Sequence, residues 1–184
     1  MVHKIAVIVG SIRKDSINRK LAGALARLAE GKLDMEILRI DDLPLFNQDD
    51  EANPTPAVTR FKDALRAADG LLFVTPEHNR SVPAAMKNAI DWATRPSGQS
   101  AFRGKVGAIA GTSKGRISTA VAQQHLLTIL HGHLAALLGS PEAYVQFADD
   151  LIDETGAIAN EATRKFLTTF IDNFARLVAA MARG

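Results

Sequence analysis

Three polar stretches in this sequence combine residue types that bind a phosphate or hold a flat heterocycle. The first stretch, Gly10–Asn18 (GSIRKDSIN), contains serine hydroxyls, an Asn amide and a guanidinium directly before a helical pattern. Backbone N–H groups and the dipole at a helix start attract an anion, and Arg13 can add a charge-assisted hydrogen bond. Such a donor set suits a terminal phosphate monoester, with candidate ligands Ser11, Arg13, Ser16 and Asn18.

Helix capping is the alternative explanation for this first stretch. Ser16 or Asn18 can simply cap the helix that follows, but capping accounts for one residue and leaves Ser11 and Arg13 unexplained. The stretch also lacks the GxGxxG and GxxxxGK[ST] patterns, whose glycines let the backbone approach a pyrophosphate or polyphosphate. The residue types therefore favour a monoester.

The other two stretches also follow apolar runs. Pro76–Ser81 (PEHNRS) presents Glu77 and Asn79, and Gly111–Gly115 (GTSKG) presents Ser113. Loops of this kind can offer donors and acceptors to the edge of a heterocycle. An ordinary strand-to-helix turn is the alternative for the second stretch.

Five short β-like runs, each followed by a helical pattern, are expected to position these stretches. The runs are Lys4–Val9, Met35–Ile40, Gly70–Thr75, Lys105–Ala110 and Ala143–Phe147. The helices are expected near Asn18–Glu30, Ala57–Ala68, Val82–Thr94, Ser118–Leu138 and Asn160–Ala182. Continuously apolar strands that alternate with helices are typical of a parallel sheet covered on both faces.

This alternation predicts an α/β fold in a single domain over residues 1–184. We expect a flavodoxin-like, doubly wound, five-stranded parallel sheet in the order 2-1-3-4-5, with helices on both faces. Ligands bind such sheets beyond the carboxyl ends of the strands, where the winding reverses. The three polar stretches all follow strands at that edge.

Together GSIRKDSIN, TPEHNRSVPAAMKNAIDWATRP and GTSKG resemble the NADPH-dependent FMN reductase family, which includes quinone- and chromate-reducing members. The resemblance extends from Lys4 to about Glu142. It implies that the FMN phosphate is held by Ser11, Arg13, Ser16, Ile17 and Asn18. It also implies that the isoalloxazine lies along Pro76, Glu77, His78 and Asn79, with a further contact from Ser113. Two positions stand out, because the family often has Tyr at His78 and varies at Arg80.

The resulting hypothesis is an oxidoreductase that passes electrons from NADPH or NADH through FMN to quinones or similar small acceptors, such as chromate, azo compounds or free flavin. The flavin carries the chemistry, so no catalytic acid or base is assigned. The main alternative is a flavodoxin-type electron carrier, although such carriers tend to be acidic and to enclose the flavin between aromatics. A phosphate-ester enzyme without flavin is a second alternative. The resemblance further implies a homodimer or homotetramer.

The amino-acid composition argues against several other classes of protein and of binding partner. The chain of 184 residues has no Cys and a formal charge of +2, with Lys and Arg scattered along it. We therefore expect no disulfide, no nucleic-acid partner and no membrane insertion, and a cytoplasmic location. No metal is expected: the acids of Asp41–Pro56 lack EF-hand spacing, and the histidines of the fourth helix suit packing or an interface. Trp92 is expected either to stack on the flavin or to cover the core or a subunit contact.

Overall fold

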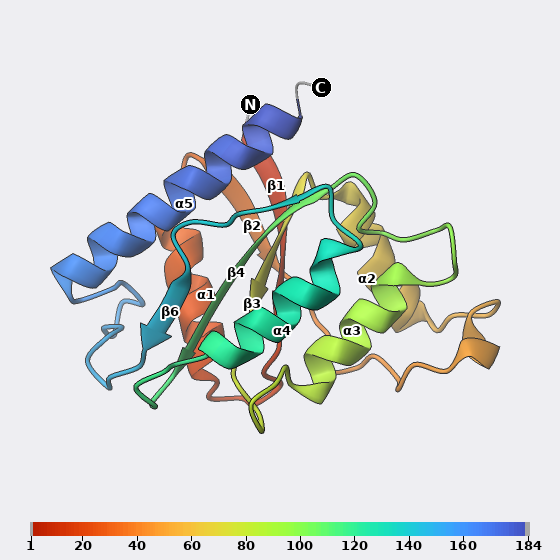
Figure 1. Ribbon diagram of the computed structural model, residues 1–184, viewed down its shortest axis with the longest axis horizontal. Coiled ribbons are helices and arrows are strands. Elements are labelled where there is room, and N and C mark those ends of the chain that lie inside the picture. Colours follow the sequence, from red (N-terminus) through yellow and green to blue (C-terminus); the bar gives the residue numbers. More distant parts are fainter. Residues whose placement is uncertain (1, 183–184) are drawn as a thin grey trace.

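The computed structural model describes residues 2–182, which form a parallel sheet between two layers of helices (Figure 1). The strands are β1 (His3–Val9), β2 (Leu33–Ile37), β3 (Gly70–Val74), β4 (Val106–Ser113), β5 (Ala136–Leu137) and β6 (Ala143–Gln146). The helices are α1 (Ile17–Leu28), α2 (Pro56–Ala67), α3 (Ala84–Thr94), α4 (Ala120–His131) and α5 (Glu161–Met181), and a short 3-10 helix η1 covers Gln48–Asp50.

The strand order confirms the predicted flavodoxin-like fold. The sheet runs β2-β1-β3-β4, and all its strand pairs are parallel. Its fifth position is divided between two short strands. β5 pairs with the first residues of β4, and β6, the predicted fifth strand, pairs with the last ones. The prediction of five strands is therefore right in order but misses β5.

Both faces of the sheet are buried, which explains the continuously apolar strands. Along β1, Val7 and Val9 pack in one core with α1 and α5, and Ile8 packs in a second core with α2, α3 and α4. Figure 1 shows these two helical layers on either side of the strands. Because side chains alternate along a strand, each apolar run supplies both cores.

The fourth helix is shorter than predicted. The spacing of apolar residues predicts a helix over Ser118–Leu138, but α4 ends at His131 with Gly132 as its C-cap. Leu134 and Leu137 lie beyond the helix and cover Gly107 of β4, where an added Cβ would stand 2.6 Å from Leu134. The leucines are therefore apolar because they cover the sheet edge, not because they belong to a helix face.

The other boundaries differ from the predicted ones by a few residues. The second strand, for example, begins and ends earlier than the predicted Met35–Ile40. Its pairing with β1 finishes where the Leu38 N–H donates a hydrogen bond to the Val7 carbonyl, and the chain then turns away from β1. The carboxyl ends of β1, β3 and β4 all reach the lower edge of the sheet in Figure 1, where the loops carrying the three polar stretches lie.

Candidate functional site

The loop of residues 10–16 leads directly into α1. The Ser16 hydroxyl caps the helix by accepting a hydrogen bond from the Arg19 N–H at 3.2 Å, and Ile17 is the first helical residue. Ser11 is half-buried and Arg13 is exposed. Within residues 2–182 Arg13 makes no ion pair, and the first turn of α1 contains no acidic residue. The capping explanation therefore holds for Ser16 and leaves Ser11 and Arg13 uncommitted.

Asn18 connects α1 to the sheet. Its buried side chain donates to the Thr112 carbonyl at 2.9 Å and accepts from the Thr112 N–H at 3.0 Å. The Ala110 carbonyl accepts from the N–H of Thr75, the residue directly after β3, so the backbone groups of Thr112, two residues on, face the same side. β3 has already ended at Val74, and Asn18 takes the place of its next residues. The amide side chain thus holds the start of α1 against the end of β4.

The loop after β3 contains a tight two-residue turn. The His78 N–H donates to the Ser81 carbonyl at 3.0 Å, and the Ser81 N–H donates back at 2.9 Å. The central residues, Asn79 and Arg80, have φ of 50° and 62°, as in a type I′ turn. His78, Asn79 and Arg80 are exposed, and Pro76 is half-buried. The turn thus projects from the carboxyl edge with a geometry set by its own backbone.

Glu77 fastens this turn to α4. One carboxylate oxygen accepts a hydrogen bond from the Ala122 N–H at 3.1 Å, and the other lies 3.5 Å from the Arg80 guanidinium. The N-cap residue of α4, Thr119, makes no capping bond with its side chain. A negative charge near a helix start is favourable, so Glu77 replaces the missing cap.

A further contact on this turn comes from one of the fourth-helix histidines, for which the sequence predicted only packing or an interface. The His125 Nδ1 lies 3.0 Å from the Ser81 hydroxyl, one turn along α4 from the Glu77 contact. Ser81 and His125 are 44 residues apart. Nothing in local spacing signals that they meet, and only the docking of α4 against the sheet brings them together.

The third loop folds around Ser113. Its hydroxyl donates to the Ser118 carbonyl at 3.0 Å and accepts from the Gly115 N–H at 3.3 Å. Just before it, a Cβ at Gly111 would lie 2.3 Å from both the Thr75 carbonyl and the Thr119 hydroxyl. Only glycine fits there, because the end of β3 and the start of α4 approach β4 so closely.

The three stretches therefore meet at one edge, and their chemistry fits a phosphorylated flat ligand. The start of α1 offers the Ser11 hydroxyl, the Arg13 guanidinium and helical N–H groups, and the one carboxylate of the preceding loop, Asp15, is exposed to solvent. Loops 76–81 and 113–119 lie on the neighbouring strand ends, and contacts within the protein fix both. This donor set fits the terminal phosphate of FMN.

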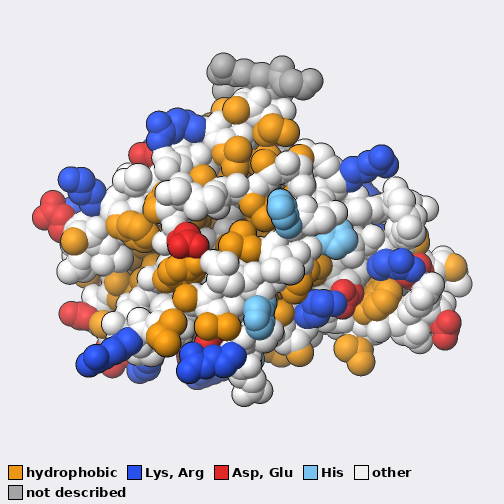
Figure 2. Space-filling view, in the orientation of Figure 1, with side chains coloured by type: hydrophobic (Ala, Val, Ile, Leu, Met, Phe, Trp, Pro, Cys, Tyr) orange, Lys and Arg blue, Asp and Glu red, His pale blue; other side chains and the backbone are white. Residues whose placement is uncertain are grey.

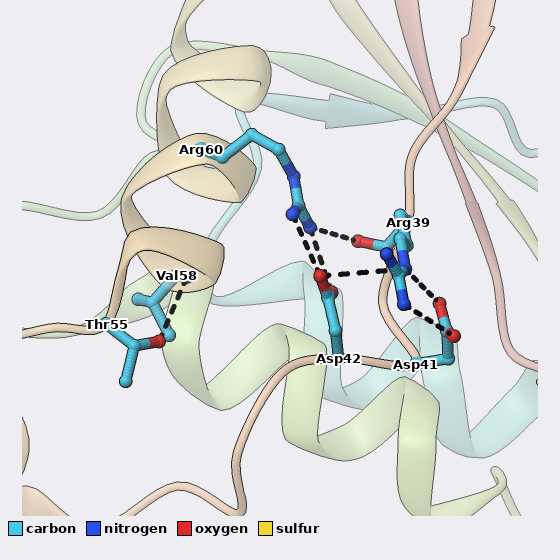
Figure 3. A network of polar contacts seen from close by, with 6 residues as sticks. All are labelled: Arg39, Asp41, Asp42, Thr55, Val58 and Arg60. Carbon is cyan, nitrogen blue, oxygen red and sulfur yellow. Dashed lines mark hydrogen bonds and ion pairs between the residues drawn. The ribbon is translucent and has the colours of Figure 1, made fainter.

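Two arginines hold the acidic loop after β2. Arg60 on α2 binds both Asp42 oxygens at 2.9 Å, and Arg39 binds Asp41 at 3.0 and 3.3 Å (Figure 3). Hydrogen bonds from these arginines lower the pKa of both carboxyls. No group of three metal-binding side chains occurs in the described part of the chain.

Trp92 supports this same loop. Its ring is 2% exposed, and its Nε1 donates to the Pro44 carbonyl at 2.8 Å. Phe46 packs edge-on against it, with ring centroids 5.1 Å apart. This burial supports the interpretation that Trp92 covers the core. The nearby Lys87 and Asp91 form a surface ion pair at 2.6 Å.

A parallel sheet of this order, with polar loops at the point where the winding reverses, defines a flavodoxin-like protein. The chain belongs to the NADPH-dependent FMN reductase family, whose family model matches residues 3–150. The predicted family is thereby confirmed, and with it an oxidoreductase that uses FMN and a reduced nicotinamide.

Similar proteins extend the match to nearly the whole chain. A 2-hydroxy-1,4-benzoquinone reductase of a Burkholderia species is 48% identical over 178 residues, 97% of each chain. A quinone reductase of Pseudomonas putida is 47% identical, covering 96% of this chain and 95% of that protein. The solved structure of FerB, a flavoenzyme NAD(P)H:(acceptor) oxidoreductase from Paracoccus denitrificans, has a TM-score of 0.94 and 44% identity, covering 98% and 99% of the two chains. These relatives are enzymes, which favours the enzyme prediction over the electron carrier. Among residues 2–182, no helix has the length and apolar character needed to cross a membrane.

Proposed function

We propose that this protein transfers electrons from NAD(P)H to quinones, with FMN bound at the carboxyl edge of the sheet. The observation that carries the proposal is that the polar groups at that edge fall into two sets, one bound within the protein and one without a protein partner in the described part of the chain. Contacts within the protein hold the three loops in place, while the donors at the start of α1 remain uncommitted. FMN, when bound, accepts two electrons from reduced nicotinamide and passes them to an acceptor. The chain's own residues bind it and orient it.

The phosphate is proposed to lie at the start of α1. The Ser11 hydroxyl and the Arg13 guanidinium supply side-chain donors, and Ile17 and Asn18 supply backbone N–H groups. The side chains of Ser16 and Asn18 already bind the protein. We therefore assign these two residues a supporting role, in which they orient the helix start toward the phosphate.

The flavin ring is proposed to lie beside the other two loops. Pro76, Glu77, His78 and Asn79 would line one ring edge, and Ser113 would lie near the other end of the site. The Glu77 carboxylate is engaged by Ala122, so the loop would contact the ring chiefly through its backbone. A turn with fixed φ presents N–H and C=O groups in a constant geometry, which favours one ring orientation.

The surroundings of this site suit a quinone as the acceptor. Ile12 and Ile117 project from the first and third loops with 58% and 56% of their surface exposed. Two exposed apolar side chains at the rim suit the flat, largely apolar body of a quinone. The names of the relatives support the same acceptor class. Chromate, azo compounds and free flavin remain further acceptors to assay.

We also propose a homodimer or homotetramer in the cytoplasm, where NAD(P)H is available. Figure 2 shows apolar side chains (orange) spread over the face that carries α4. A groove there is lined by Leu127, Leu134 and Leu137, which a neighbouring subunit would cover. Light scattering of the flavin-loaded protein at micromolar concentration tests this assembly. A mass of 19.8 kDa, that of one chain, would contradict it.

The test of the proposed function begins with titration of the apoprotein. We expect binding of FMN to exceed that of riboflavin, because riboflavin lacks the phosphate that Arg13 and the helix start would bind. Addition of NADPH or NADH to the yellow protein should then bleach the flavin, and a quinone should restore its colour. Equal affinity for FMN and riboflavin would contradict the phosphate site, and failure of both nucleotides to bleach the flavin would contradict the enzyme.

A further inference from the structure

Arg80 occupies a backbone conformation that does not suit it. Type I′ turns require positive φ at both central residues and strongly favour Asn followed by Gly. Asn79 fits the first position, but Arg80 has a φ of 62° in the position where glycine is preferred. A residue with a Cβ is disfavoured in this region, so the chain retains an unfavourable conformation to display a guanidinium.

The contacts of Arg80 do not account for this cost. Its side chain is 69% exposed, and its ion-pair partner among residues 2–182 is Glu77 at 3.5 Å. The second oxygen of Glu77 binds the Ala122 N–H on α4, so the carboxylate keeps a structural partner without Arg80. Exposed ion pairs of this kind contribute little to stability. The Arg80 guanidinium therefore contributes little to the stability of the fold and remains accessible to a ligand.

The position of the turn indicates which kind of ligand the Arg80 guanidinium would contact. The turn follows β3 at the carboxyl edge, and Figure 2 shows Lys and Arg side chains (blue) along the lower border of the molecule, below α4. Nearby titratable groups are His78 within the turn and His125, which contacts Ser81. Glu77 is the carboxylate in contact with Arg80, and it is only 10% exposed. A ligand that approaches this rim therefore meets a positive charge.

We propose that Arg80 determines specificity by binding the negative charge of an anionic acceptor, such as an ionised hydroxyquinone. This inference rests on the proposed function, because it places the acceptor beside the flavin ring. A hydroxyl on a quinone ring ionises readily, since its charge spreads over the conjugated carbonyl oxygens. Guanidinium groups bind such oxygens through charge-assisted hydrogen bonds.

The test compares two acceptors that differ in charge, 2-hydroxy- and 2-methoxy-1,4-benzoquinone. In Arg80→Gly we expect the ratio of their kcat/KM values, charged over neutral, to fall about fivefold, a modest effect because the contact is partly exposed. Glycine tolerates positive φ, so the thermal midpoint of the variant apoprotein should equal or exceed that of the wild type. Arg80→Lys keeps the charge, and its ratio should stay within about twofold of the wild-type value.

Three outcomes would overturn the inference. The first is an unchanged ratio in Arg80→Gly, and the second is a clear fall in its thermal midpoint, which would make Arg80 structural. The third is a shift in preference between NADPH and NADH without a shift between the quinones, which would assign the charge to the nucleotide. All three leave the proposed function intact if the variant still reduces the methoxyquinone, whereas loss of quinone reduction by the wild type would remove that function itself.

Discussion

The side chains at the start of α1 fall into two groups that mutations can separate. Ser16 and Asn18 bind the protein backbone, and Asn18 does so with both ends of its amide. Ser11 and Arg13 have no such partner in the described residues and are more exposed. Substitutions in the first group should affect folding, and substitutions in the second should affect ligand binding.

Arg13→Ala should weaken FMN binding and leave the apoprotein as stable as before. Loss of one hydrogen bond to a charged group costs about 1.5–3 kcal/mol, which corresponds to a dissociation constant about ten- to a hundredfold higher. Titration of the apoprotein by flavin fluorescence measures this change. Lys14→Ala, which removes the neighbouring exposed cation, is the matched control. Equal weakening in both variants would mean that only general positive charge matters.

Thr112→Val should stabilise the apoprotein by about 1 kcal/mol. The Thr112 hydroxyl is the buried side-chain polar atom without a hydrogen-bond partner within residues 2–182, and valine removes it at nearly the same volume. Urea unfolding of the apoprotein measures the change. Thr75→Val is the control, because the equally buried Thr75 hydroxyl donates to the Pro76 carbonyl at 2.8 Å and its loss should destabilise. Destabilisation in both variants would indicate a partner for Thr112, such as a buried water.

Helix α4 depends on a carboxylate that the loop after β3 supplies. Glu77→Ala should lower the apoprotein's free energy of unfolding by about 1–2 kcal/mol, because the Ala122 N–H loses its acceptor and the helix start loses its negative charge. Glu77→Gln keeps an acceptor and should lose less. Urea unfolding without flavin is the measurement. An unchanged apoprotein would mean that Glu77 acts only on the ligand.

The ion pair that joins the acidic loop to α2, between Asp42 and Arg60, should stabilise the fold in a pH-dependent way. The Arg60 guanidinium lowers the pKa of Asp42 below its unfolded value of about 3.9, so this pair stabilises the fold above that pH and ceases to do so as the pH falls through the lowered pKa. Asp42→Asn should therefore cost up to about 1 kcal/mol at pH 7. Urea unfolding from pH 7 downward should show the two proteins converging below about pH 4. A difference that persists in strong acid would point to a cause other than charge.

Local sequence patterns predict most helices and strands of this fold. They fail where the same spacing of apolar residues fits either a helix or another element. Apolar runs of Val, Ile and Leu identify β1, β3 and β4, because strands buried on both faces have no polar positions. Leu134 and Leu137, three residues apart, satisfy a helical spacing equally well, although they cover the sheet edge. Gly132 was the available stop signal.

The sequence predicts which loops form the site, but it does not predict the contacts that hold those loops in place. Topology alone indicates that the stretches after β1, β3 and β4 share an edge. The pairs that fix them, Asn18 with Thr112 and Glu77 with Ala122, are 94 and 45 residues apart in sequence. No local rule reports such contacts. Both side chains look like ligand-binding groups in the sequence, because Asn and Glu serve either purpose equally well.

At the scale of the whole molecule, the proposed flavin site would serve both substrates, which predicts their kinetic order. The sheet reverses its winding once between β1 and β3, and the three loops converge there. A nicotinamide and a quinone that use the same ring face cannot bind together, and the chain has no Cys to provide a second electron route. Initial rates at several fixed quinone concentrations should give parallel double-reciprocal lines. Intersecting lines would mean that both substrates bind at once.

The bond between Asn18 and Thr112 also bears on how the protein acquires its cofactor. It ties the Asn18 side chain at the start of α1 to the main chain of Thr112, so we expect the proposed phosphate site to be formed before flavin binds. Uptake of FMN then needs no segment to fold, and its heat-capacity change should reflect little more than the apolar surface of the flavin itself. We therefore expect the protein to lose its flavin and regain it without passing through an unfolded state.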